Sequence, residues 1–137
     1  MATNPVSFYY RKDLNVTKHG EYKAAVAMPF GTAVKRNDVT LEAEVAANSA
    51  EFEGVADKVI YTIQGNDDLN LAAKERCRVG VGKDYEIVLM ADKLGSTVAV
   101  GDKVEVKTGK FQKVTTDTAV GKVVAKFANG ETVIRIN

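Results

Sequence analysis

The sequence from Val123 to Ile136, VVAKFANGETVIRI, decides the fold class because it has the pattern of a β-hairpin. Asn129 and Gly130 both tolerate a positive φ, so they suit the two-residue type I′ turn that matches the twist of paired strands. This turn sets a register whose more apolar face we expect to be buried. That face pairs Phe127 with Thr132, Ala125 with Ile134 and Val123 with Ile136, while the other pairs Lys126 with Val133 and Val124 with Arg135.

A second hairpin is predicted upstream of the first. Thr108-Gly109-Lys110 has the composition of a three-residue loop in which Gly109 is left-handed. Such a loop would set Val104 opposite Val114 and Glu105 opposite Lys113.

Other segments show the two-residue period of half-buried strands. In 39–45 we expect Val39, Leu41, Ala43 and Val45 on the buried face; in 57–63 Val59, Tyr61 and Ile63; in 76–81 Cys77, Val79 and Val81; in 85–89 Tyr85, Ile87 and Leu89. A further strand is expected around 22–30.

One segment, from Asp67 to Arg76, has a helical pattern, because Asp67 or Asp68 can cap it and residues of good helix propensity follow. The sequence therefore predicts an all-β protein, a small β-barrel or two-sheet sandwich with an extended N-terminal arm and one short helix. We expect the arm over residues 1–20 and a single β-barrel-like domain over residues 21–137.

The expected arm is rich in aromatic side chains but lacks a sustained period. Its aromatic residues either fold back onto their own core or dock on a neighbouring chain. The candidate contact residues are Val6, Phe8, Tyr9, Tyr10 and Arg11.

The composition is that of an ordinary globular domain, with 137 residues, 45% apolar and 27% charged. Net charge is +1 and basic residues alternate with acidic ones, so no basic stripe emerges and no nucleic-acid partner is expected. No segment approaches a membrane-spanning length and the N-terminus lacks the apolar core of a secretory signal, so we expect no membrane partner. The single cysteine, Cys77, is compatible with synthesis in a reducing cytoplasm.

Residues for catalysis are sparse in the sequence. His19 is the one histidine, and Cys77 alternates with valines as a buried cysteine does. The 79–83 segment, VGVGK, lacks the spacing of a phosphate-binding loop, and Asn66-Asp67-Asp68 lacks the further ligands of a calcium loop. We therefore predict a protein that is not an enzyme and has no catalytic residue, cofactor or metal site.

Several segments, taken in order, resemble the small capsid decoration, or cement, proteins of tailed phages. Each consists of turn glycines and alternating valines, so the resemblance lies in their order along most of residues 31–137. The segments are Gly31–Val34, Phe52–Ala56, Glu75–Leu89, Val98–Val106, Gly109–Val114, Val120–Ala125 and Thr132–Ile136. The 67–76 insertion and the long aromatic arm depart from the shortest members of this family.

The resemblance implies a β-barrel-like body, made in the host cytoplasm, that binds the outer surface of the expanded phage head at junctions between capsomers. The implied partners are the major capsid protein and further copies of the same chain, for example in a trimer. The implied role is to stiffen the shell, with no catalysis.

Two other readings remain open from the sequence. One is another virion β module, associated with a tail or fibre. The other is an SH3-like or OB-like nucleic-acid-binding domain, which would need a basic groove with stacking aromatic residues.

Overall fold

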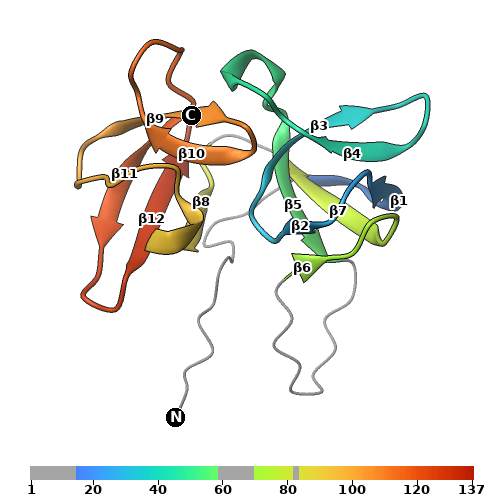
Figure 1. Ribbon diagram of the computed structural model, residues 1–137, viewed down its shortest axis with the longest axis horizontal. Helices are drawn as coiled ribbons and strands as arrows, with labels where there is room; N and C mark the ends of the chain where they lie inside the picture. Colours follow the sequence, from blue (N-terminus) through green and yellow to red (C-terminus); the bar gives the residue numbers. More distant parts are fainter. Residues whose placement is uncertain (1–14, 59–69, 82–83) are drawn as a thin grey trace.

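The computed structural model describes residues 15–58, 70–81 and 84–137, which form two lobes side by side (Figure 1). The chain is mostly β, as the sequence predicts. The first lobe is a closed barrel with the strand order β1-β4-β3-β5-β7. Its strands are β1 (Asn15–Ala24), β3 (Ala33–Asn37), β4 (Glu42–Val45), β5 (Gly54–Lys58) and β7 (Arg76–Val81).

The second lobe is a five-stranded sheet with the order β10-β9-β11-β12-β8. Its strands are β8 (Glu86–Met90), β9 (Lys103–Lys107), β10 (Lys110–Lys113), β11 (Gly121–Lys126) and β12 (Glu131–Ile136). A small two-stranded sheet pairs β2 (Met28–Pro29) with β6 (Asn70–Leu71). The two helical elements of the described residues are single 3-10 turns, η1 (Ser49–Glu51) and η2 (Ala91–Lys93). None of the helices described is long and apolar enough to cross a membrane.

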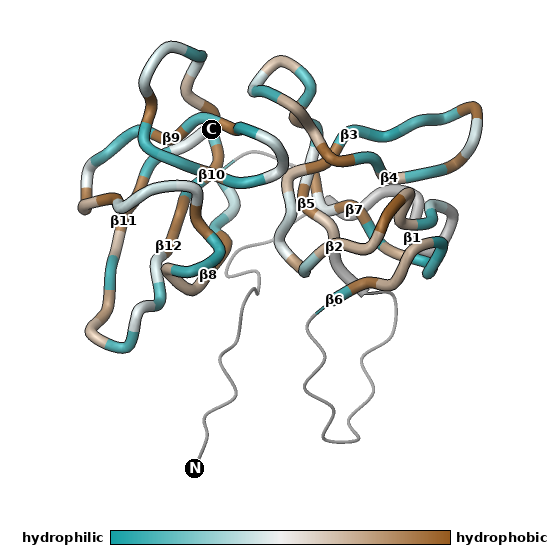
Figure 2. Tube along the Cα trace, in the orientation of Figure 1, coloured by the Kyte–Doolittle hydropathy of each residue, from teal (hydrophilic) through white to brown (hydrophobic). Residues whose placement is uncertain are grey.

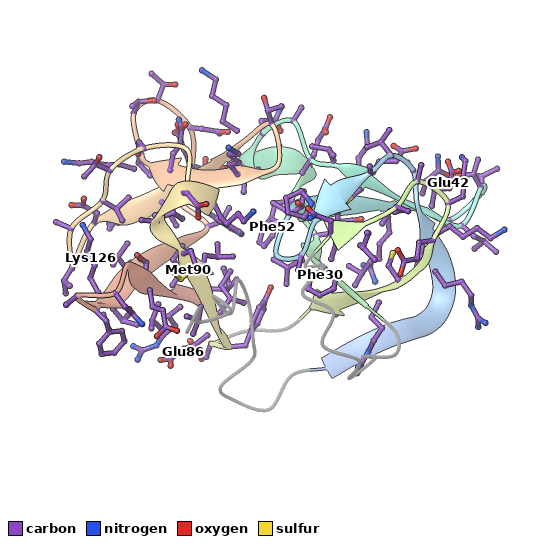
Figure 3. The ribbon with its side chains drawn as sticks, turned by 60° about the horizontal axis from the view of Figure 1, so that its bottom comes forward. Phe30, Glu42, Phe52, Glu86, Met90 and Lys126 are labelled. Atoms are coloured by element: carbon purple, nitrogen blue, oxygen red, sulfur yellow. The ribbon has the colours of Figure 1, made fainter. Side chains whose placement is uncertain are left out.

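One apolar core runs through both lobes. Val34, Val55 and Val79 of the barrel belong to the same buried cluster as residues of the second sheet, because strand alternation turns one face of each sheet inward. Phe52, where the lobes meet (Figure 3), packs edge to face on the buried Phe111 with 5.5 Å between ring centroids. The lobes are therefore joined by packed side chains as well as by the chain itself.

Main-chain hydrogen bonds also join the lobes at the tip of the β9–β10 hairpin. Gly109 N donates to Ala46 O at 2.8 Å, and Gly109 O accepts from Ala33 N at 2.9 Å. Thr108 N donates to Ala47 O at 3.0 Å. The turn of the β9–β10 hairpin in the second lobe is thus hydrogen-bonded to the barrel of the first lobe, next to β3 and β4.

The β9–β10 hairpin differs from the predicted one by one residue. Phe111 pairs with Val106 and Gln112 with Glu105, so the predicted pairing of Glu105 with Lys113 is wrong. The loop has two residues, Thr108 and Gly109, both with positive φ (49° and 81°), as a type I′ turn requires. The predicted left-handed Gly109 is confirmed.

In the β11–β12 hairpin the loop is one residue longer than predicted, whereas the β9–β10 loop is one residue shorter. Lys126 pairs with Thr132 and Ala125 with Val133, and the register shifts before Val123 pairs with Ile134, so the predicted register is wrong. Phe127 N donates to Glu131 O at 2.8 Å, which leaves a three-residue loop. In that loop Gly130 has a positive φ of 96° and Asn129 does not, so the turn is not the predicted type I′ turn. Val123, Ile134 and Ile136 are buried as expected, whereas Phe127 is exposed.

The predicted helix over 67–76 is wrong for the residues described. Asn70–Leu71 is strand β6, paired with β2, and Leu71 is fully buried. The chain then turns at Lys74, which has a φ of 69° and donates its N–H to Ala24 O at 2.7 Å. This turn brings Arg76 into β7, so good helix propensity is overridden by tertiary pairing.

The remaining strand predictions have mixed outcomes. The 76–81 and 85–89 strands are present, with Cys77, Val79, Tyr85, Ile87 and Leu89 buried as expected. In the 39–45 segment Ala43 is buried, but β4 begins only at Glu42, so Val39 and Leu41 lie in the preceding turn and are exposed. Val59, Tyr61 and Ile63 lie outside the described residues. Strand β1 begins at Asn15, inside the range 1–20 that we expected to form an arm.

Candidate interaction surfaces

The candidate contact residues Val6, Phe8, Tyr9, Tyr10 and Arg11 all lie outside the described residues. Their contact with a neighbouring chain stays a prediction. The described residues carry three other surface features that sequence reasoning missed: a groove between the lobes, a protruding hairpin tip and paired lysines of the second sheet.

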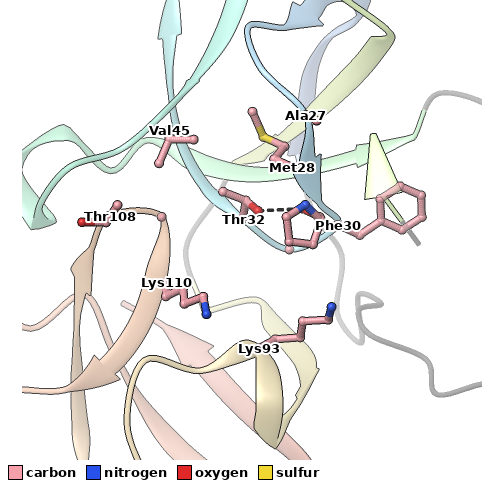
Figure 4. Close-up of a pocket in the computed structure, with 11 residues that line it drawn as sticks. Ala27, Met28, Phe30, Thr32, Val45, Lys93, Thr108 and Lys110 are labelled. Carbon is pink, nitrogen blue, oxygen red and sulfur yellow. Dashed lines mark hydrogen bonds between the residues drawn. The ribbon is translucent and has the colours of Figure 1, made fainter. Parts of the chain in front are cut away.

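The groove lies where the β9–β10 hairpin meets the barrel and has a volume of about 210 Å³ (Figure 4). Its apolar wall comes from the segment around β2, with Ala27, Met28 and Pro29, and from Val45 of β4. The opposite wall comes from the second lobe, through 108–110 and Lys93.

Local hydrogen bonds fix the apolar wall of the groove. Thr32 Oγ1 donates to Pro29 O at 2.7 Å, which closes a tight turn after β2. Gly31, with a φ of 83°, donates its N–H to Ala56 O at 2.9 Å and anchors that turn to the barrel. The positive φ explains why glycine stands there.

Two lysines face the apolar wall across the groove. Lys93 comes from η2 and Lys110 from the start of β10, and Figure 4 shows both side chains in the space between the lobes. Within residues 15–58, 70–81 and 84–137, neither ammonium group forms an ion pair with a carboxylate. The groove is therefore apolar on one side and cationic on the other.

The hairpin tip is the turn between β3 and β4, residues 37–42. Val39 is 93% exposed and Leu41 is 46% exposed. Figure 2 shows this hydrophobic tip at the end of hydrophilic strands. Isolated exposed apolar residues are common on proteins, but two on one protruding turn form an apolar knob.

The tip is held in one conformation by polar groups below it. Asn37 Oδ1 accepts hydrogen bonds from Val39 N at 3.0 Å and from Thr40 N at 3.1 Å. The Tyr22 hydroxyl donates to the Asp38 carboxylate. Burial, together with this bond to Asp38, raises the pKa of Tyr22 to about 12. The Asn37 and Tyr22 bonds therefore order the turn that carries the exposed side chains.

Leu41 is also conformationally strained. Its φ of 59° lies in the left-handed region, which costs a residue with a Cβ about 1–2 kcal/mol. Its main-chain oxygen accepts a hydrogen bond from Lys23 N at 2.9 Å, which holds the backbone in place. Strain of this kind is a reason to look for a function of the turn.

Strand pairing in the second sheet brings together lysines that are separated in the sequence. Lys107 lies opposite Lys110 on β9 and β10, and Lys103 lies opposite Lys122 on β9 and β11. All four are exposed. Like charges directly opposite each other destabilise a sheet. The lysines become neighbours only through strand register, so the alternation of basic and acidic residues along the sequence does not reveal the cluster.

Reactive groups are sparse in the part of the chain that the structure describes. No group of three or more His, Cys, Asp or Glu side chains there is placed to hold a metal ion. Cys77 is fully buried in β7. No known family model and no curated protein match this sequence.

Proposed function

We propose that this chain is a decoration protein of a tailed-phage capsid, which binds the outer surface of the expanded head and reinforces it. The observation that carries the proposal is the braced β body: two lobes share one apolar core and are joined by main-chain hydrogen bonds at Gly109. The sequence segments that, taken in order along the chain, resemble capsid cement proteins support the same function.

Bracing matters because a reinforcing protein has to transmit force between the subunits that it bridges. Hydrogen bonds from Gly109 and Thr108 to the barrel resist separation of the lobes. Packing of Phe52 on Phe111 resists their sliding. A body of this kind is suited to span neighbouring capsid subunits.

The proposed partner is the major capsid protein, contacted by Val6, Phe8, Tyr9, Tyr10 and Arg11. Aromatic residues supply much of the binding energy of many interfaces. Many copies on a repeating lattice, or several linked contacts per assembly, turn modest affinity into stable attachment.

Copy counting by mass spectrometry on virions of the phage that encodes the chain is the first test. We expect a copy number comparable with that of the capsomers. A few copies per particle would contradict the proposal and indicate a tail or fibre module, and absence from the particles would refute a virion role.

Co-sedimentation of the purified chain with expanded heads tests the contact residues. Replacing Phe8, Tyr9 and Tyr10 together with alanine should weaken binding at least about 30-fold, since interface aromatic residues often contribute about 2 kcal/mol or more. The matched control is Phe127→Ala, which removes an exposed aromatic ring from the β11–β12 loop and should leave binding unchanged. Equal binding of the triple variant and wild type would refute the role of these aromatics.

A second candidate function, nucleic-acid binding, is favoured by the two pairs of exposed lysines in the second sheet. Against it, Phe127 is the one exposed aromatic residue among those described, so stacking platforms are few. Filter binding at low salt distinguishes the two functions. Salt-sensitive retention of single-stranded DNA or RNA that Lys103→Glu with Lys107→Glu abolishes would favour this second function.

A further inference from the structure

We propose that copies of this chain associate head to tail, with the hairpin tip of one copy (residues 37–42) docked in the groove of the next. This inference concerns the chain alone and does not depend on attachment to a capsid. In this arrangement the tip is the ligand of the groove, and the groove is the binding site of the tip.

The two surfaces lie at opposite ends of one hairpin. Asn37 pairs with Glu42 beside the tip, whereas Val34 pairs with Val45 beside the groove. The hairpin projects from the barrel away from the second lobe (Figure 1), so the tip cannot reach the groove of its own chain. A second copy can present its tip there, and repetition of the contact is then head to tail.

The two surfaces are complementary in chemistry. Val39 and Leu41 offer exposed apolar side chains, and Met28, Pro29 and Val45 offer an apolar wall. Asp38, an exposed residue whose carboxylate also accepts a hydrogen bond from the Tyr22 hydroxyl, directly precedes Val39 at the tip. Lys93 and Lys110, which lack ion pairs within the described residues, would face that carboxylate across the groove.

The tip is also ordered before it binds. Asn37 bonds to the N–H groups of Val39 and Thr40, and Leu41 is held left-handed despite the strain. An ordered tip loses less conformational entropy on docking than a flexible one would, so a small contact can be specific. The strain at Leu41 is then explained, because the left-handed turn presents both apolar side chains on one knob.

The contact is heterologous, since different surfaces meet on the two copies. Such a contact closes into a ring if its rotation allows, and otherwise continues as a filament. An acidic loop of another protein has some of the same chemistry, but the tip, within the part of the chain that the structure describes, combines exposed apolar side chains with an adjacent acidic residue.

Sedimentation velocity on the purified full chain tests the proposal. Wild type should form assemblies larger than a monomer at concentrations up to about 1 mM. The tip variant Val39→Asn with Leu41→Gly and the groove variant Lys93→Glu with Lys110→Glu should each raise the dissociation constant at least about tenfold. Val100→Asn, which replaces a 60% exposed valine outside both surfaces, should associate as wild type does.

A mixing experiment shows whether tip and groove meet each other. The tip variant retains an intact groove, and the groove variant retains an intact tip. An equimolar mixture should therefore form one-to-one dimers and nothing larger, although each variant alone is monomeric. Circular dichroism confirms that both variants are folded.

Three outcomes would overturn the proposal: monomeric wild type over this concentration range, tip or groove variants that associate like wild type, or a mixture that stays monomeric. If either variant fails to fold, single substitutions Val39→Asn and Lys110→Glu replace it in the same mixture. Because no capsid is used, failure here is distinct from failure to bind phage heads.

Discussion

Gln112 Nε2 donates a hydrogen bond of 2.6 Å to Glu105 Oε2 across the β9–β10 pair. The same carboxylate, 2% exposed as a residue, accepts hydrogen bonds from Thr115 N at 3.1 Å and Asp117 N at 2.9 Å. The carboxylate of Asp117 in turn accepts from Ser49 N of η1 at 2.8 Å. Glu105 therefore fixes the 115–117 loop of the second lobe, and that loop is hydrogen-bonded to η1 between two strands of the barrel.

This chain of bonds predicts an acid-sensitive fold. The N–H of Asp117, followed by the Gln112 amide, holds the pKa of Glu105 at about 2, below its ordinary value of 4.5. Because the pKa is lower in the folded state, the carboxylate stabilises the fold fully above about pH 4.5 and loses that contribution as the pH falls toward 2. The N–H of Ser49 lowers the pKa of Asp117 as well, which acts in the same direction.

Glu105→Gln should therefore lower stability near neutral pH and flatten its acid dependence. Urea midpoints measured at about pH 7 and about pH 3 check this, because the difference between them should be smaller in the variant than in wild type. Glu131→Gln, at the start of β12, is the matched control and should behave as wild type. An unchanged difference in Glu105→Gln would show that the carboxylate does not couple folding to pH.

Gly109 should tolerate no side chain. A Cβ there would lie 2.8 Å from Val45 Cγ1 and 2.9 Å from Thr32 Cγ2, and the φ of 81° adds strain. We expect Gly109→Ala to cost about 2–4 kcal/mol of unfolding free energy, by overpacking and left-handed strain together. Gly101→Ala is the control, because Gly101 has a φ of 97° but no atom within 4 Å of such a Cβ, so strain alone should cost about 1–2 kcal/mol. Equal losses of unfolding free energy in the two variants, measured by chemical denaturation, would contradict close packing of the β9–β10 turn against the barrel.

The sequence predicts the strands well and their registers poorly. Alternation was enough to find the two C-terminal hairpins, yet both loops differ from prediction by one residue. Thr108, a β-branched residue, adopts a positive φ because its N–H and that of Gly109 are bonded to the barrel. Such long-range bonds override local turn preference, and no local pattern reports them.

The surface features are hidden for the same reason. The groove combines residues 27–32, 45, 93 and 108–110, which only tertiary structure brings together. The tip departs from the predicted strand, because Val39 and Leu41 continue the apolar period of β4 although the chain turns before Glu42. The left-handed φ of 59° at Leu41 is also a conformation that the residue type does not predict.

Phe111 should be the most sensitive aromatic residue of the second sheet. It is fully buried and packs edge to face on Phe52 at the junction of the lobes. Phe111→Ala should lower the unfolding free energy by about 3–5 kcal/mol, through lost burial and a cavity. Phe127→Ala, at a residue that is 50% exposed, should lower it by less than about 1 kcal/mol. Similar losses in the two variants, measured by urea denaturation, would show that the lobes do not depend on this contact.

Leu41 offers a test of whether strain is retained for association. Leu41→Gly removes the left-handed strain of about 1–2 kcal/mol but adds flexibility to the unfolded chain, so stability should be unchanged or rise by up to about 1 kcal/mol. Leu41→Ala removes the same side chain beyond Cβ but keeps the strain, so it should be about 1 kcal/mol less stable than Leu41→Gly. Both variants should weaken self-association, because each removes the apolar group of the tip. An alanine variant as stable as the glycine variant in thermal and urea denaturation would mean that the turn is not strained, and the conformation of Leu41 would then no longer need a bound partner to explain it.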